Sequence, residues 1–141
     1  MSSKQLDNLV QMGSLKAEPA DQKEFDGLVG SGRKRLADAG KSALAPESRF
    51  DLAYGAAHAF SLAAMRWHGY RPNNQRFVVF QALEHTLDLK PKLWRVLDKC
   101  HRSRNLAEYE GSFEVDEQLL AELLEVTQVV RQLVEKLGPI K

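Results

Sequence analysis

The chain has 141 residues, of which 43% are hydrophobic and 28% are charged, and these values are typical of one soluble globular domain. Its formal net charge is +1, so the overall charge gives no reason to bind nucleic acid or anionic lipid. Cys100 is the single cysteine, which excludes an intramolecular disulfide and a multi-cysteine zinc site. We find no apolar run suited to a signal peptide or a membrane span, and therefore expect a cytoplasmic protein without membrane association.

The first half of the chain predicts three helices. Apolar spacing predicts a short opening helix that ends near Gly13, and a second helix follows Pro19. Glycines within this second helix each cost about 1 kcal/mol relative to alanine. Residues 46–68 give the clearest pattern, because Pro46 suits a first helical turn and small or aromatic side chains recur every three or four residues. The many small residues predict a central helix that its neighbours approach closely.

The second half predicts three more helices and no convincing strand. Gly69 ends the central helix, and residues 70–74 form a turn in this interpretation. Helical patterns then cover residues 77–87, a segment opened by Pro91, and residues 115–137, with a break at Gly111 and Ser112. We expect an all-α, antiparallel up-and-down bundle of four to five main helices plus a short N-terminal helix. It forms a single domain over residues 1–141, with N-terminal helices in 1–45 and the core in 46–138.

The segment from Lys99 to Tyr109 carries the candidate chemistry. The apolar stripe of the helix that contains Cys100 reaches Arg104, while Arg102, Asn105 and Tyr109 follow an adjacent face. Because a buried guanidinium needs a partner, Arg104 is expected to bind an acid such as Asp51, Glu84 or Glu108, which would make the cluster structural. Arginine, asparagine and tyrosine on one basic face also make a workable phosphate site, and both interpretations remain open.

Other polar residues carry weaker signals. His101 shares a helix face with Arg104 and is a candidate base, or else a partly exposed member of the basic face; His58 is interpreted as a hydrogen-bonded packing residue. No two histidines have metal-ligand spacing, so no metal or other cofactor is expected. The segment Gly30–Arg35 lacks the spacing of a phosphate-binding loop, and its basic triplet suits either a solvated face or nucleic-acid contact. The arginines around the turn are expected to face a partner or solvent: Arg66, Arg71 and Arg76.

Arg104-Asn105 late in a penultimate helix resembles the HEPN superfamily signature, an arginine followed after four to six residues by histidine. Tyr109 occupies the histidine position here. The pieces Arg49-Phe50-x-x-Ala53-Tyr54 and Gly69-Tyr70-Arg71-Pro72 also resemble uncharacterised bacterial members, and the resemblance covers residues 48–137. It implies a homodimer related to metal-independent ribonucleases, in which the arginine steadies phosphate charge and the histidine moves a proton. A tyrosine with an ordinary pKa near 10 is a poor replacement for that histidine.

The resemblance therefore predicts a non-catalytic binding module that engages a partner protein, a nucleotide or an RNA phosphate. Arg102, Arg104, Asn105 and Tyr109 are its expected contacts. A nucleotidyltransferase partner and a role in a toxin–antitoxin or stress-defence system are also implied by the family. The alternatives are a divergent metal-independent endoribonuclease that uses Arg104 with His101, and a purely structural interaction bundle.

Overall fold

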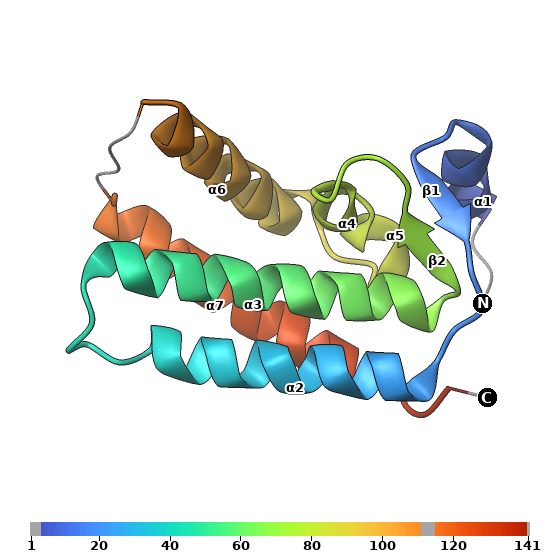
Figure 1. Ribbon diagram of the computed structural model, residues 1–141, viewed down its shortest axis with the longest axis horizontal. Helices are drawn as coiled ribbons and strands as arrows, with labels where there is room; N and C mark the ends of the chain where they lie inside the picture. The colour runs from blue at the N-terminus through green and yellow to red at the C-terminus, as the bar shows by residue number, and fades with distance from the viewer. Residues whose placement is uncertain (1–3, 111–114, 141) are drawn as a thin grey trace.

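The computed structural model describes residues 4–110 and 115–140, with the side chains of residues 107–110 outside the description (Figure 1). Most of the described chain is helical, as the sequence predicts. Gly111 and Ser112, the predicted break, lie outside the described residues. In chain order the elements are α1 Lys4–Gln11, β1 Leu15–Ala17, α2 Gln22–Ala39, α3 Pro46–Trp67, β2 Tyr70–Pro72, α4 Val78–Gln81, α5 Leu83–Thr86, α6 Pro91–Glu110 and α7 Glu117–Glu135. No helix of this described part is long and apolar enough to cross a membrane.

Helix α3 lies at the centre of the bundle, as predicted. It packs along α2 and α7, and α6 is inclined away from it at one end (Figure 1). The alanines at positions 53, 56, 57, 63 and 64 are fully buried, and their small side chains allow the neighbouring helices to approach closely. Gly32 of α2 meets the buried ring of Phe60 in the same way, since a Cβ at Gly32 would lie 2.6 Å from that ring.

The expectation of no strand is wrong for two short segments, one before α2 and one after α3. Residues Leu15–Ala17 and Tyr70–Pro72 form a two-stranded antiparallel sheet, in which Leu15 pairs with Pro72 and Ala17 with Tyr70. Gly13 and Gly69 have positive φ angles of 84° and 88°, a conformation that glycine adopts without strain, so the chain can turn just before each strand. The predicted turn after α3 therefore begins with a short strand.

A buried guanidinium fastens this sheet to the bundle. The Arg66 side chain is 1% exposed, and it donates hydrogen bonds to the carboxylate of Glu24 and to the backbone carbonyls of Glu18, Pro19 and Tyr70. The Arg66 guanidinium also lies 3.5 Å from the Glu18 carboxylate. Arg71 binds the carboxylates of Glu18 and Glu24, at 2.7 Å and 2.6 Å. The expectation that Arg66 and Arg71 face a partner or solvent is therefore wrong, because both complete an internal network.

The segment predicted as one helix over residues 77–87 contains two short helices, α4 and α5, that meet at Ala82. Hydrogen bonds span three residues at the junction and at the start, from the His85 amide to the Ala82 carbonyl and from the Phe80 amide to the Phe77 carbonyl. These bonds tighten the turns and interrupt a regular α-helix. Every side chain from Val78 to Leu83 except that of Gln81 is buried, so this segment packs into the core on most of its sides.

The last two long helices agree with the sequence pattern. Helix α6 begins at Pro91, and the predicted C-terminal helix is α7. The Asp116 side chain caps α7 by accepting hydrogen bonds from the amides of Gln118 and Leu119. Cys100 is fully buried, and burial raises the pKa of its thiol to about 12, as suits a cysteine that serves as a small core hydrophobe.

Candidate functional site

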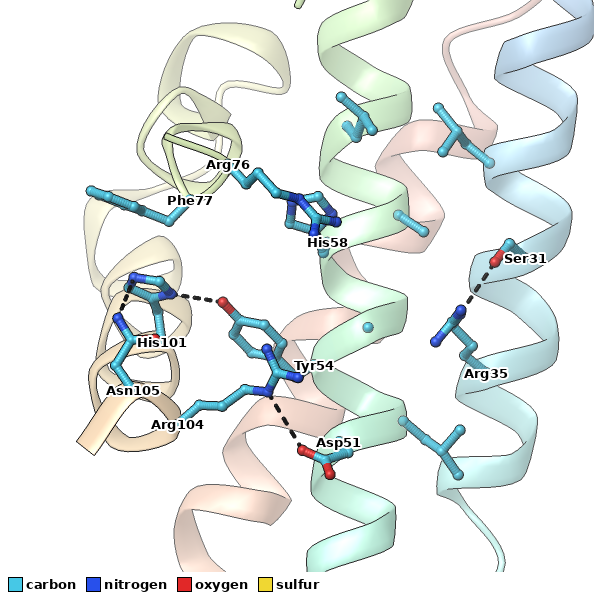
Figure 2. A pocket seen from close by; sticks show the side chains of 15 residues that line it. Ser31, Arg35, Asp51, Tyr54, His58, Arg76, Phe77, His101, Arg104 and Asn105 are labelled. Carbon is cyan, nitrogen blue, oxygen red and sulfur yellow. Dashed lines mark hydrogen bonds and ion pairs between the residues drawn. The ribbon is translucent and has the colours of Figure 1, made fainter. Parts of the chain in front are cut away.

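An open cleft of about 570 Å³ crosses the outer face of α3 between α2 and α6 (Figure 2). Its floor is a face of α3, where the apolar side chains of Leu52, Ala59 and Leu62 accompany Tyr54 and His58. Polar side chains from α2, from the segment before α4 and from α6 surround this floor. The cleft therefore combines apolar and polar groups that come from well-separated parts of the chain.

Arg35 lines the α2 side of the cleft. Its Nε donates a hydrogen bond to Ser31 Oγ at 3.2 Å, one helical turn earlier. The guanidinium lies over Gly55, where a Cβ would be 3.0 Å from Nη1. Gly55 thus leaves space that the Arg35 side chain occupies, and α3 brings the floor close to this charge.

Arg104 lines the opposite side and contacts two residues of α3. Its guanidinium lies 4.9 Å from the centre of the Tyr54 ring, which is a cation–π distance. Its Nε is 3.5 Å from Oδ1 of Asp51, which was one of the predicted acid partners. The Arg104 side chain remains 40% exposed, so it is not the buried residue that its place in the stripe suggested.

His101 is held by hydrogen bonds at both ring nitrogens. The side-chain amide of Asn105 donates to Nε2 at 3.1 Å, and Nδ1 is 2.8 Å from the Tyr54 hydroxyl. With Nε2 accepting, the proton of the neutral ring lies on Nδ1 and is donated to Tyr54. Phe77 stacks on the imidazole with ring centres 4.7 Å apart. His101 is consequently fixed in one orientation, with both nitrogens in use.

His58 occupies the middle of the cleft with one ring nitrogen unused (Figure 2). Its ring meets the Phe80 ring edge-on, with the ring centres 5.9 Å apart. Nε2 is buried and has no hydrogen-bond partner among the described residues. Burial lowers the pKa of His58 from 6.5 to about 4, and the charge of Arg76 adds to this effect. The imidazole is therefore neutral near pH 7.

The charges that line the cleft are unequal. Arg35, Arg76 and Arg104 contribute guanidinium groups, whereas Asp51 is the only carboxylate among the described lining residues. Arg76 is exposed, and Figure 2 shows its side chain reaching toward His58. Neither Arg35 nor Arg76 forms an ion pair with a carboxylate in the described part of the chain. The cleft is therefore locally cationic in a protein whose net charge is only +1.

The structure divides the predicted site residues into three groups. Arg104, Asn105 and His101 line the cleft together. Arg102 does not line it, because its side chain is 72% exposed and lies 3.6 Å from Asp98 on the same helix. The Tyr109 side chain lies outside the described residues, as does that of Glu108, and the remaining suggested acid, Glu84, lines a different hollow.

Several cleft residues were not predicted as members of the site. Arg35 was treated as part of a basic triplet, Arg76 as part of a turn, and His58 as a packing residue. Tyr54 and His58 are four residues apart and therefore share one face of α3, which is a signal that the sequence does contain. No comparable signal joins Arg35 or Arg76 to α6, because their proximity results from tertiary packing.

No family model matches the sequence, and searches of the curated proteins and of the solved structures gave no significant match. The chemistry of the cleft is therefore argued from its own residues. Guanidinium groups bind phosphate and carboxylate groups through paired hydrogen bonds. In the described part of the chain, no three histidine, cysteine, aspartate or glutamate side chains are grouped as metal ligands.

Another hollow, of about 690 Å³, lies between the end of α5 and the end of α7. It mixes acidic and basic side chains, with Glu84 and Asp88 opposite Lys4 and Lys136. His68 there is already bonded through Nε2 to the Thr86 carbonyl at 2.8 Å. Because its charges balance, this hollow has no comparable preference for an anion.

Proposed function

We propose that the cleft binds the phosphate groups of a nucleotide or of single-stranded RNA, and that the protein acts as a binding module. The observation that carries the proposal is the meeting of Arg35, Arg76 and Arg104 around one cleft beside a single described carboxylate. These side chains come from α2, from the segment before α4 and from α6. The three guanidinium groups repel one another, and a bound anion would offset this repulsion.

The individual arginines differ in what they offer a phosphate. Arg35 and Arg76 have no described carboxylate partner, so they can bind the ligand without breaking an ion pair. Arg104 must share its charge with Asp51, and its contact with the Tyr54 ring holds the guanidinium at the cleft. Asp51 therefore repels an incoming phosphate. Removal of its charge should strengthen binding, whereas removal of an arginine should weaken it.

The direct test is to measure the binding of a fluorescently labelled oligouridylate of about ten nucleotides by fluorescence anisotropy. Loss of one charge-assisted contact should weaken binding roughly 10- to 100-fold in Arg104→Gln and in Arg76→Gln. Asp51→Asn should strengthen binding a few-fold. Arg102→Gln is the matched control, since it removes the same charge from the same helix outside the cleft and should have little effect. Equal losses in Arg102→Gln and Arg104→Gln would contradict the proposal.

We further propose that the fold is an antiparallel, up-and-down bundle of the HEPN type. Short connections support this arrangement, such as the six residues 40–45 between α2 and α3. The presence of both Arg104 and Asn105 at the cleft is consistent with the signature that suggested the family. A homodimer is part of this proposal, and light scattering of the purified protein tests it. A stable monomer would contradict it.

A divergent metal-independent ribonuclease is the second candidate. The observation in its favour is that His101 and Arg104 line the same cleft. Against it, both ring nitrogens of His101 are already engaged by Tyr54 and Asn105. Chelator-resistant cleavage of total RNA that disappears in Arg104→Ala and in His101→Ala would favour the enzyme. Unchanged RNA in the presence of a folded protein that binds it would favour the binding module.

A further inference from the structure

Two consecutive residues of α3, Tyr54 and Gly55, each lie beneath an arginine from a different side of the cleft. The Arg104 guanidinium of α6 lies 4.9 Å from the centre of the Tyr54 ring. Arg35 of α2 lies over Gly55, where a Cβ would be 3.0 Å from its Nη1, 3.4 Å from its Cδ and 3.7 Å from its Cζ. One guanidinium therefore rests on an aromatic face, and the other rests where a side chain is missing.

The absence of a side chain at Gly55 is explained by Arg35. Gly55 lies inside α3, with alanines at positions 53, 56 and 57, and glycine stabilises a helix interior less than alanine does. Its backbone is helical, so its conformation does not require glycine. The three atoms nearest to a Cβ at this position all belong to the Arg35 side chain. The space that glycine leaves is therefore the space that the guanidinium occupies.

Arg35 is held at its base and open at its tip. Its Nε donates to Ser31 Oγ at 3.2 Å, and the described residues provide no carboxylate partner for this side chain. Both Nη groups are thus left for a ligand. Because Ser31 and Gly55 already restrict the guanidinium, less side-chain freedom is lost when the ligand binds.

The two arginines are placed at the same level of α3. Consecutive residues of an α-helix differ by only ~1.5 Å along its axis, and their side chains point in different directions around it. Figure 2 shows Arg35 and Arg104 reaching toward α3 from opposite sides. Their guanidinium groups therefore converge across the cleft and do not follow one another along it.

We propose that Tyr54 and Gly55 are positioning residues, which place Arg104 and Arg35 so that both guanidinium groups bind a single phosphate group from opposite sides. This inference rests on the proposed phosphate binding and identifies the unit that is bound. Each guanidinium can form paired hydrogen bonds with phosphate oxygens. A ligand with one phosphate group therefore suffices to engage both arginines, and a run of phosphates along a strand is not needed.

The role of Gly55 is tested with the labelled oligouridylate and fluorescence anisotropy. Gly55→Val fills the space of the guanidinium and should weaken binding as much as Arg35→Gln, roughly 10- to 100-fold. Gly55→Ala should weaken it about 2- to 10-fold, while its melting temperature equals or exceeds that of the wild type, because alanine favours the helix and the exposed Arg35 side chain can move aside. Gly27→Ala is the matched control outside the cleft and should leave binding unchanged.

A double-mutant cycle separates positioning from general damage to the floor. In protein that already carries Arg35→Gln, Gly55→Val should cause no further loss, since the side chain that it displaces has been removed. For the other arginine, Tyr54→Phe keeps the ring beneath Arg104 and should recover most of the binding that Tyr54→Leu loses.

Uridine 5′-monophosphate tests whether one phosphate engages both arginines. Its affinity is measured from amide chemical shifts, with uridine as the control that lacks the phosphate. Arg35→Gln and Arg104→Gln should each weaken binding of the monophosphate by about tenfold or more. A loss in only one of the two variants would show that the arginines bind separate groups and would overturn the single-phosphate contact.

The remaining outcomes separate this inference from the proposal on which it rests. Wild-type affinity for the oligomer in Gly55→Val, with Arg35 still required, would overturn the positioning role and leave phosphate binding intact. A further loss on adding Gly55→Val to Arg35→Gln would also overturn it. If neither Arg35→Gln nor Arg104→Gln weakens the binding of either probe, both proposals fail.

Discussion

Acidification should destabilise the protein through His58. Burial and the charge of Arg76 lower the pKa of this residue from 6.5 to about 4 in the folded state. Between these values the unfolded chain binds a proton that the folded protein does not, so the free energy of unfolding falls as the pH falls. The contribution of His58 to stability is present above its unfolded pKa and is lost as the pH approaches the folded pKa.

The magnitude follows from the size of the shift. A difference of about 2.5 pKa units corresponds to about 3 kcal/mol over the whole window, at 1.36 kcal/mol for each unit. Between about pH 7 and about pH 5 the expected loss is about 2 kcal/mol, because the unfolded ring becomes largely protonated there while the folded ring remains neutral.

Urea unfolding followed by circular dichroism, at both pH values, measures this loss. The wild type should lose about 2 kcal/mol more than His58→Gln, which cannot titrate at this position. Burial also lowers the pKa of His68, but that contribution is common to both proteins and cancels in the difference. An identical loss of stability in wild type and variant would refute the argument that His58 is buried and neutral.

Three further predictions concern the helices that build the cleft. Gly32→Ala should destabilise the fold by about 1–3 kcal/mol in thermal unfolding, because the new Cβ would overlap the Phe60 ring. Gly27→Ala, whose Cβ meets nothing within 4 Å, should stabilise the fold by about 1 kcal/mol. Stabilisation by both substitutions would contradict the packing of α2 on α3. Arg66→Met should cost about 3–5 kcal/mol in urea unfolding, since the backbone carbonyls of Glu18, Pro19 and Tyr70 lose their donor at about 1–3 kcal/mol each. A loss below about 1 kcal/mol would contradict the buried network. The Cys100 thiol should not react with iodoacetamide near pH 7 unless urea unfolds the protein, since burial raises its pKa to about 12; modification of the folded protein, detected by mass spectrometry, would contradict this placement.

The helices were predictable because their signals are local. Pro46 marks the start of α3, and the small and aromatic residues of that helix recur with a helical period. The two strands were not predictable, because each has only three residues and pairs with a partner more than fifty residues away in the sequence. The interruption at Ala82 was also missed, since the apolar residues of 77–87 are spaced as they would be in one continuous helix.

The candidate site shows the same division. Arg104, Asn105 and His101 were found together because they lie within one helical turn of α6. Arg35 and Arg76 joined them only when α2 and the segment before α4 packed against α3. Helical spacing alone also placed Arg102 in the set, although that side chain points to Asp98 and away from the cleft. The unused nitrogen of His58 is a property of the packed structure and has no counterpart in the sequence.

The most direct test of phosphate binding at this cleft is a map of amide chemical shifts during titration with the oligouridylate. The account predicts that the largest changes occur at Gly55 and His58 on the floor and at Arg104 and Asn105 on α6, all of which line the cleft. Changes centred on the hollow around His85, or none at a saturating concentration, would contradict the central claim.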